Sequence, residues 1–286
     1  MKILVTGASG FIGGEVARLA AADGHEVAVL VRKATVRLPG RVLVGNMEAP
    51  PWDAIREFSP EACIHCAWIA TPGVYLDSPE NETLVESSMA LASGLVECGL
   101  QHFVGAGTCF EYDSSPSPLH TSAPAPANCS PYAAAKIRLH RQLAEILASK
   151  VAFSWGRIFY AYGPREHPKR FPSILLTNFS EGKPVTVNRP RDIVDYIHVR
   201  DIAAAFLTIA TGNRPGDFNV GSGCPVTVGE VAATAARLTG RNDLLILGQH
   251  DDVTGRCADM ACWDGLPWSP QISLEDGLRE MMLLRQ

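Results

Sequence analysis

A glycine-rich turn near the N-terminus limits the possible folds of this chain more than any other feature. Residues 3–6 form a short apolar run, residues 13–22 show helical spacing, and residues 26–31 are apolar and β-branched. The turn between the first two segments has the pattern G-x-x-G-x-x-G, from Gly7 to Gly13. A strand, a tight turn, a helix and a second strand in this order predict a βαβ unit.

Each glycine of this turn has its own physical role. Gly7 permits the tight turn, Gly10 lets a phosphate approach the backbone, and Gly13 lets the helix pack close to the sheet. Free N–H groups and the helix dipole at this position favour the negative pyrophosphate of a dinucleotide. An ordinary strand-to-helix turn is the alternative, but the flanking strand and helix favour dinucleotide binding. We expect cofactor contacts from Gly7, Ser9, Gly10, Phe11, Ile12 and Gly13.

The rest of the chain continues the alternation of strands and helices. Short apolar runs at 42–44, 62–66, 103–106 and 153–158 are separated by helical patterns such as 84–98. This alternation predicts an α/β fold with a doubly wound parallel sheet of the Rossmann type, covered by helices on both faces.

The length and composition allow one large α/β unit with a smaller lobe. The chain has 286 residues, of which 47% are hydrophobic and 19% are charged, so a substantial core is expected. Segments in the C-terminal half are shorter and more mixed in character. We expect a dinucleotide-binding domain over 1–156, with 192–211 returning to it, and a smaller C-terminal substrate lobe formed mainly by 157–286.

The charge balance and the hydropathy argue against several classes of partner. The formal net charge is -5, the isoelectric point is near 5.9, and no basic stripe stands out, so nucleic acid is not an expected partner. No run approaches the roughly 20 apolar residues of a membrane helix, and the N-terminus lacks a signal-peptide pattern. We therefore expect a cytoplasmic protein that does not bind membranes.

The eight cysteines do not indicate a disulfide scaffold or a metal site. A long, core-rich chain without a secretion signal does not need disulfides. Cys63 and Cys66 form a C-x-x-C motif, but they lie in an apolar run that predicts a strand. Side chains three apart on a strand face opposite ways, which is poor for joint metal ligation. We interpret them as buried small hydrophobes and expect no metal.

The end of the second predicted strand bears on the choice of cofactor. An acid at this position normally binds the adenosine ribose hydroxyls of NAD, but here the strand ends in Arg32 and Lys33. Arg32 would pair with a 2′-phosphate, whereas a carboxylate would repel it. The alternative is that both cations are solvated loop charges. The missing acid and the added cation agree, so we expect NADP, with NAD possible.

A tyrosine and a lysine share one face of a well-capped helix. Ser130 is a good N-cap and Pro131 suits the first helical position, so a helix is expected from 131 to about 149. Tyr132 and Lys136 are four residues apart on it. A nearby ammonium group favours the tyrosine phenolate, which can then accept or donate the proton of a substrate hydroxyl. A bare Y-x-x-x-K usually marks a surface helix, but here it follows a dinucleotide turn.

A third polar group is expected to polarise the substrate oxygen. Thr108 follows the predicted strand 103–106, and ligands bind at the carboxyl ends of strands in open α/β sheets. Its hydroxyl both donates and accepts. A plain turn threonine is the alternative. Cys109 and Glu111 are lesser candidates, because the cysteine is expected to be buried and the acid to be solvated.

With these motifs in place, the chain resembles the extended short-chain dehydrogenases/reductases, in particular the NAD-dependent epimerase/dehydratase family that acts on nucleotide sugars. The resemblance covers almost the whole chain. Besides the glycine turn and the Tyr132 helix, it is carried by segments 64–67, 107–112, 157–164, 195–201, 218–223 and 268–278.

The resemblance implies a Rossmann domain, a nucleotide-sugar lobe and a catalytic triad of Thr108, Tyr132 and Lys136. It also implies a homodimer paired through the helices 84–98 and 131–149. Asn46 and Met47 replace the usual Asp-Leu near the adenine. Further residues that it places at the cofactor are Cys66, Ala67, Trp68 and Phe159, beside Tyr132 and Lys136.

Three departures from the family pattern bear on the reaction. Cys109 and Phe110 follow Thr108 where dehydratases carry Asp-Glu, so dehydration is disfavoured. Val194 replaces an arginine that usually contacts the pyrophosphate of the sugar nucleotide, and Tyr160 replaces an asparagine that usually contacts substrate. The candidates to replace the arginine are Arg189, Arg191 and Arg256. We expect Thr108, Tyr160 and Arg256 at the substrate.

Four functions are compatible with these features. The sequence around Thr108 resembles that of reductases acting at C4 of 4-keto-6-deoxy sugar nucleotides. The first hypothesis is therefore an NADPH-dependent 4-ketoreductase. The second is a nucleotide-sugar 4-epimerase with tightly bound NAD. A reductase of another carbonyl compound is the third. A non-catalytic dinucleotide-binding regulator is the fourth, and the intact Tyr132–Lys136 pair argues against it.

Overall fold

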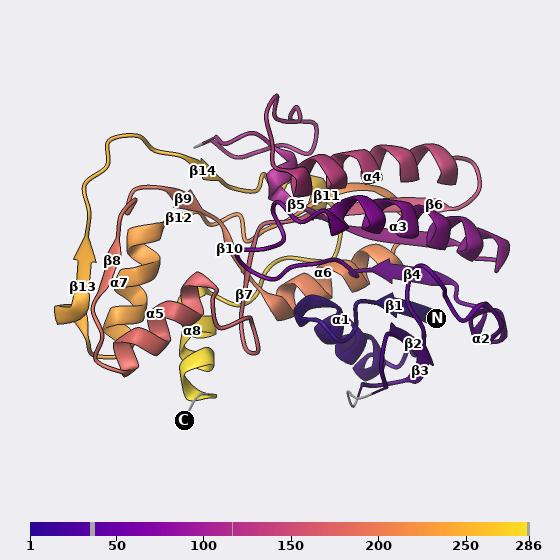
Figure 1. Cartoon of the computed structure of the whole chain (residues 1–286), viewed down its shortest axis with the longest axis horizontal. Helices are drawn as coiled ribbons and strands as arrows, with labels where there is room; N and C mark the ends of the chain where they lie inside the picture. The colour runs from indigo at the N-terminus through magenta and orange to yellow at the C-terminus, as the bar shows by residue number, and fades with distance from the viewer. Residues whose placement is uncertain (35–37, 116, 285–286) are drawn as a thin grey trace.

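The computed structural model describes residues 1–34, 38–115 and 117–284 (Figure 1). Its central feature is a seven-stranded sheet with the order β11-β6-β5-β4-β1-β2-β3, in which every neighbouring pair is parallel. Its strands are β1 Lys2–Thr6, β2 Glu26–Val31, β3 Arg41–Val44, β4 Ala62–His65, β5 His102–Thr108, β6 Ala152–Ile158 and β11 Gly216–Val220. The strand order reverses beside β1, as in doubly wound Rossmann sheets, so the predicted fold class is confirmed.

Helices cover both faces of this sheet. Figure 1 shows α3 (Glu80–Glu97) and α4 (Pro131–Leu147) along one face, and α1 (Phe11–Ala22) and α6 (Val199–Thr211) along the other. The first face also includes α2 (Trp52–Phe58), whose Ile55 and Phe58 join the core of α3 and α4. Successive residues of each strand point into the two hydrophobic cores on opposite faces of the sheet. The strands are therefore apolar throughout and do not alternate between apolar and polar residues.

The glycine turn has the geometry that its sequence predicts. Gly7 has φ +71°, and a Cβ on it would lie 2.7 Å from the backbone nitrogen of Ala67. A Cβ on Gly13 would lie 2.5 Å from the carbonyl oxygen of Gly7, so this glycine packs against the turn itself. Helix α1 begins at Phe11, two residues earlier than the predicted start at Gly13. The helix N-terminus therefore reaches further toward the end of β1.

A smaller lobe lies to the left of the sheet in Figure 1. Its helices are α5 Phe171–Ser180, α7 Val228–Leu238 and α8 Leu274–Leu283, which share a third core. Its short strands pair as β8 Val185–Val187 with β13 Leu245–Leu247, and β9 Ile193–Val194 with both β12 Val226–Thr227 and β14 Gly255–Arg256. Between lobe and sheet, β7 Tyr160–Tyr162 pairs with β10 Tyr196–His198. The described part of the chain also contains the single-turn 3-10 helices η1 Cys109–Glu111, η2 Asn242–Leu244 and η3 Ala261–Trp263.

Two segments from the C-terminal half belong to the sheet layers. Helix α6 joins the core of α1, and β11 pairs in parallel with β6 at the edge of the sheet. The division drawn from the sequence had placed β11 in the lobe. The strand is short and interrupted by polar residues, so its pattern is weak, but pairing with β6 buries Phe218 against Trp263, with ring centres 4.9 Å apart.

Among the described residues, no helix is both long enough and apolar enough to cross a membrane.

Candidate active site

The three predicted catalytic side chains come together at the carboxyl end of β5. Thr108 is the last residue of β5, because the strand extends two residues beyond its predicted end at Ala106. Ser130 caps α4 by accepting a hydrogen bond from Ala133 N at 3.3 Å, and Pro131 takes the first helical position. This start places Tyr132 in the first turn of α4, where its side chain interacts with that of Thr108. Lys136 follows one turn later and donates from Nζ to the carbonyl oxygen of Ala106 at 2.8 Å.

Burial shifts the proton affinities of the pair in opposite directions. Lys136 is only 3% exposed, and burial lowers its pKa from 10.5 to about 7, while the charge of Glu111 opposes this shift. Burial raises the pKa of Tyr132, and the interaction with Thr108 opposes that shift. Lys136 Nζ also lies 3.7 Å from the centre of the Trp68 ring, a cation–π contact that favours the ammonium form.

Behind Thr108 lies a buried carboxylate that the sequence analysis had expected to be solvated. Glu111 is 3% exposed. Its Oε1 accepts from Thr108 N at 2.8 Å, and its Oε2 accepts from Trp155 Nε1 at 2.9 Å and Arg157 Nε at 2.8 Å. The expectation of a solvated acid is wrong because β6 brings an indole and a guanidinium to this position. Neighbouring Cys109 is buried as expected, which raises the pKa of its thiol to about 12.

The end of β4 supports the glycine turn through a histidine to which the sequence analysis gave no role. His65 Nδ1 lies 2.8 Å from Thr6 Oγ1, and its Nε2 lies 2.9 Å from Ser88 Oγ. Burial lowers the pKa of His65 to about 3, so the ring is neutral. Thr6 Oγ1 also accepts from Ala67 N at 3.2 Å, which ties the end of β1 to the end of β4. The only sequence signal was the position of His65 directly before Cys66 and Ala67.

The segment after β4 brings two aromatic residues to the site. Trp68 was predicted at the cofactor, and its Nε1 donates to Asn81 Oδ1 at 2.9 Å. Tyr75 was not predicted, yet its ring meets the ring of Tyr132 edge-on, with centres 4.9 Å apart. The backbone nitrogen of Tyr132 donates to the carbonyl oxygen of Leu76 at 3.0 Å. No periodic pattern marks this irregular segment, so the sequence gives no signal for Tyr75.

The remaining predicted cofactor residues are distributed over several environments. Ser9 and Gly10 are exposed, while Phe11 and Ile12 are partly exposed at the helix start. After the ends of β2 and β3, Arg32 and Asn46 are exposed as well. Asn46 Oδ1 accepts a hydrogen bond from Ala49 N at 2.6 Å. Met47 and Cys66 are half-buried in the sheet core. Phe159 is buried beside Cys109 and Tyr112.

The structure distinguishes the three arginines that were candidates to replace the residue at Val194. Arg256 lies on β14 in register with Val194 on β9, and its guanidinium is 5.0 Å from the centre of the Phe110 ring. Arg256 also lies close enough to Tyr160, the other predicted substrate residue, to lower the pKa of its hydroxyl, although burial raises that pKa overall. Arg256 and Tyr160 therefore lie beside η1, the short 3-10 helix that follows Thr108.

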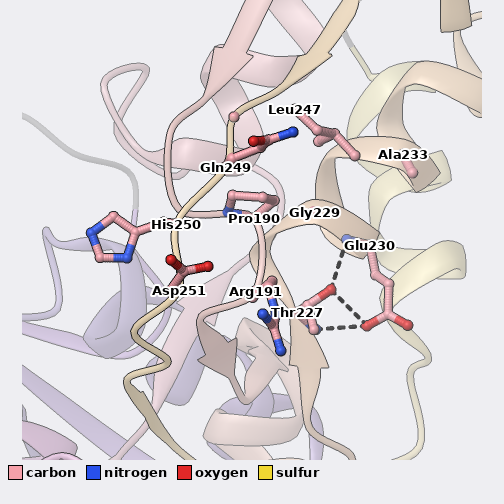
Figure 2. Close-up of a pocket in the computed structure, with 11 residues that line it drawn as sticks. Pro190, Arg191, Thr227, Gly229, Glu230, Ala233, Leu247, Gln249, His250 and Asp251 are labelled. Carbon is pink, nitrogen blue, oxygen red and sulfur yellow. Dashed lines mark hydrogen bonds between the residues drawn. The ribbon is translucent and has the colours of Figure 1, made fainter.

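The other two arginines are placed elsewhere. Arg189 binds Asp192 with its Nε at 2.6 Å and contacts the His250 ring. Arg191 is exposed and lines a hollow of about 550 Å³ on the lobe, with Thr227 and Glu230 at the start of α7 (Figure 2).

The Asp195 motif holds the lobe together. Asp195 is fully buried, and its carboxylate accepts from the backbone nitrogens of Ser222 at 2.7 Å, Gly223 at 3.1 Å and Ala258 at 3.0 Å. These bonds join the end of β11 to the segment that follows β14. Its contacts are thus those of a structural anchor.

The cysteine pair has no metal-site geometry. Cys63 is buried in β4, where burial raises the pKa of its thiol. Cys66 lies beyond the end of that strand. Over residues 1–34, 38–115 and 117–284, no group of three or more His, Cys, Asp or Glu side chains is arranged to hold a metal ion.

The fold and the Thr108–Tyr132–Lys136 arrangement define the class of short-chain dehydrogenases/reductases. The model of the NAD dependent epimerase/dehydratase family matches residues 3–221. The chain therefore belongs to this family of enzymes, and the predicted resemblance is confirmed.

Individual relatives agree with this membership. The chain is 26% identical over 309 aligned residues to the UDP-glucose 4-epimerase of Mycolicibacterium smegmatis, covering 97% of this chain and 96% of that protein. It is 28% identical over 273 residues to the UDP-glucose 4-epimerase of Streptomyces lividans, covering 84% and 81%. Among solved structures, it is similar to the UDP-glucose 4-epimerase of Thermus thermophilus in complex with NAD, with a TM-score of 0.86, 25% identity, and 99% and 98% coverage.

Proposed function

We propose that this enzyme is a nucleotide-sugar 4-epimerase, which oxidises and re-reduces the same sugar carbon. The observation that carries the proposal is the position of Tyr132 beside Thr108, with Lys136 one turn away on the same helix face. Full-length similarity to UDP-glucose 4-epimerases supports epimerisation over the 4-ketoreductase that the sequence first favoured. The substrate class is accordingly a nucleoside diphosphate sugar.

The residues of the glycine turn fit a nicotinamide dinucleotide. Gly7 holds a positive φ, Gly10 is exposed, and α1 begins directly after it, so its first N–H groups face the proposed pyrophosphate site. A bound nicotinamide would supply the hydride acceptor for the oxidation and the hydride donor for the reduction. We also assign Tyr132 and Lys136 to cofactor contact, because Lys136 lies against the ring of Trp68, another predicted cofactor residue.

The chain's own residues manage the proton and the position of the sugar. Tyr132 removes the hydroxyl proton during oxidation and returns it during reduction. The Lys136 ammonium favours the phenolate form that the first step needs. The Thr108 hydroxyl forms hydrogen bonds to the reacting oxygen and to Tyr132, and so holds the two groups next to each other. Tyr160 and Arg256 hold the rest of the substrate, with Arg256 replacing the arginine missing at Val194 as the contact to the diphosphate.

A second candidate is a 4-ketoreductase that consumes NADPH. Exposed Arg32 and Lys33 at the end of β2 favour it, because both cations suit a 2′-phosphate. Under this alternative, the same tyrosine donates a proton as hydride arrives at the ketone, and NADP replaces NAD as the physiological cofactor.

One experiment separates the two functions. Purified protein is incubated with UDP-glucose and, separately, with a 4-keto-6-deoxy nucleotide sugar plus NADPH. Epimerisation predicts interconversion of UDP-glucose and UDP-galactose without net nicotinamide consumption. Stoichiometric loss of nicotinamide absorbance with the keto sugar, and no interconversion, would overturn the epimerase in favour of the reductase.

We also propose a homodimer formed through α3 and α4. The two helices are already joined within one chain by an ion pair between Arg138 and Glu82. The outer side of α4 carries a hollow of about 620 Å³ that includes Ile137 and Arg141. Analytical ultracentrifugation of the wild-type protein and of Ile137→Glu tests it: the charge placed in the interface shifts the protein to monomer, and a wild-type monomer contradicts the proposal.

A further inference from the structure

Glu111 is bound on all sides by groups that belong to the reaction centre or to its support. It closes a capping box with Thr108: its carboxylate accepts from Thr108 N, and the Thr108 hydroxyl accepts from Phe110 N at 3.3 Å. From β6, Trp155 and Arg157 donate to the same carboxylate. A Cβ on Gly107 would lie 2.6 Å from Glu111 Oε1, so the glycine leaves room for this contact.

The carboxylate is also the negative charge that acts on the buried lysine. Glu111 and Cys66 both favour the charged form of Lys136, and burial opposes it. Trp155 lies between the two, with its Nε1 on Glu111 and its ring centre 5.7 Å from Lys136 Nζ. Glu111 acts on Tyr132 as well, where it raises the pKa, as do Tyr75 and Cys109.

Other charged groups near Glu111 moderate this effect. Arg157 pairs with Glu111 on the side away from Thr108 and also binds Asp217 at 3.0 Å. Asp217 in turn contacts His140 of α4 at 2.9 Å. Neutral His65 of β4 is the remaining titratable group that senses the lysine charge. Arg157 therefore has a second carboxylate partner, and loss of the Glu111 charge does not leave it unpaired.

We propose that Glu111 is a positioning residue for the reaction: it fixes Thr108 from behind and supplies negative charge that favours the ammonium form of the buried Lys136. This assignment rests on the proposed function, because it concerns the same catalytic pair. The charge of Glu111 favours the protonated form of both Lys136 and Tyr132. Removal of the charge lowers the proton affinity of both side chains together.

The first test measures Lys136 directly and needs no substrate. Lysine ¹³Cε resonances are followed against pH in the full chain labelled with ¹³C-lysine, and the Lys136 signal is identified by its absence in Lys136→Met. In Glu111→Gln, the Lys136 midpoint should fall by on the order of one pH unit. An unchanged midpoint would overturn the proposal, even if the proposed epimerase activity were absent.

The second test uses the reaction. If UDP-sugar interconversion is observed, Glu111→Gln should move both limbs of the pH–kcat profile to lower pH by a similar amount. A purely structural role would lower kcat and leave the limbs in place, and that result would count against the proposal.

Two further variants complete the design. Glu230 forms the same capping box with Thr227, accepting from its backbone nitrogen at 2.7 Å, but it is exposed at the start of α7. Glu230→Gln is therefore the matched control and should leave the Lys136 midpoint unchanged. If Glu111→Gln fails to fold, Glu111→Asp replaces it. Aspartate keeps the charge but shortens the reach to Thr108 N, so the midpoint should stay near wild type while kcat falls. A shifted midpoint in Glu111→Asp would contradict the proposal.

Discussion

The two ends of the proposed cofactor site are built in different ways. At the carboxyl end of β5, Thr108 and Lys136 are buried, and Tyr132 interacts with Thr108. At the end of β2, Arg32 and Lys33 are exposed to solvent. The first end is preorganised before any ligand binds, whereas the second end contributes charges that a ligand must still order.

This difference separates two questions about the enzyme. A preorganised, buried group acts strongly on a transition state because its surroundings do not have to rearrange. An exposed cation is screened by water and salt, so it contributes modestly to affinity. The buried end should therefore determine whether the reaction occurs, and the exposed end should determine which dinucleotide is preferred.

The largest expected effect is at the buried end, in Tyr132→Phe. Loss of the phenolic proton carrier should lower kcat by about 10³-fold, within the usual range for a general acid–base group. Dinucleotide affinity, measured by fluorescence titration, should change less than about threefold. Tyr75→Phe is the control, because it keeps the ring packed on Tyr132 and removes a different hydroxyl. Retention of near wild-type turnover in Tyr132→Phe would remove the tyrosine from the mechanism.

The next largest effect concerns how the free energy of unfolding depends on pH. Lys136 has a folded-state pKa of about 7, below the 10.5 of an ordinary lysine. Between these values the unfolded chain binds the proton and the folded chain does not, so stability rises with pH. From pH 7 to 9.5 the gain is about 3 kcal/mol for this group. Urea unfolding of Lys136→Met should lack that gain, and an equal slope in wild type and variant would show that the lysine is not buried in solution.

The same contrast explains what the sequence could and could not predict. The glycine turn, the capped helix of Tyr132 and the end of β5 are local patterns, and each has a direct geometric meaning. Glu111 was misjudged because its burial depends on Trp155 and Arg157, which lie on a strand more than forty residues later. Tyr75 was missed because it lies in an irregular segment whose position is fixed by packing on α4.

The lobe shows a similar limit. Val194 was recognised as a departure, but three arginines were equally plausible replacements from sequence alone. Only the pairing of β9 with β14 places Arg256 opposite Val194. Strand register between short, distant segments follows from tertiary packing, and no periodic signal in two-residue strands reveals it.

Arg256→Ala tests an intermediate case, a half-buried cation at the substrate side. If Arg256 contacts the substrate diphosphate, its loss should raise KM for a nucleotide sugar about 10- to 100-fold and change kcat less. Arg191→Ala is the matched control, because Arg191 lines the separate hollow on the lobe (Figure 2). Equal effects of the two substitutions on KM would contradict the assignment of Arg256 to the substrate.

The smallest effect is expected at the exposed end, in Arg32→Ala. If Arg32 pairs with a 2′-phosphate, the substitution should weaken NADP binding about tenfold, because one charge-assisted contact at a solvated site is worth little more than 1 kcal/mol. NAD lacks that phosphate, so its affinity should stay within about twofold, and the two dissociation constants can be measured by calorimetry on the same preparation. Added salt should reduce the difference between wild type and variant, because the contact is screened. Equal losses for NAD and NADP would show that Arg32 does not distinguish the two cofactors, and the exposed end would then have no part in cofactor choice.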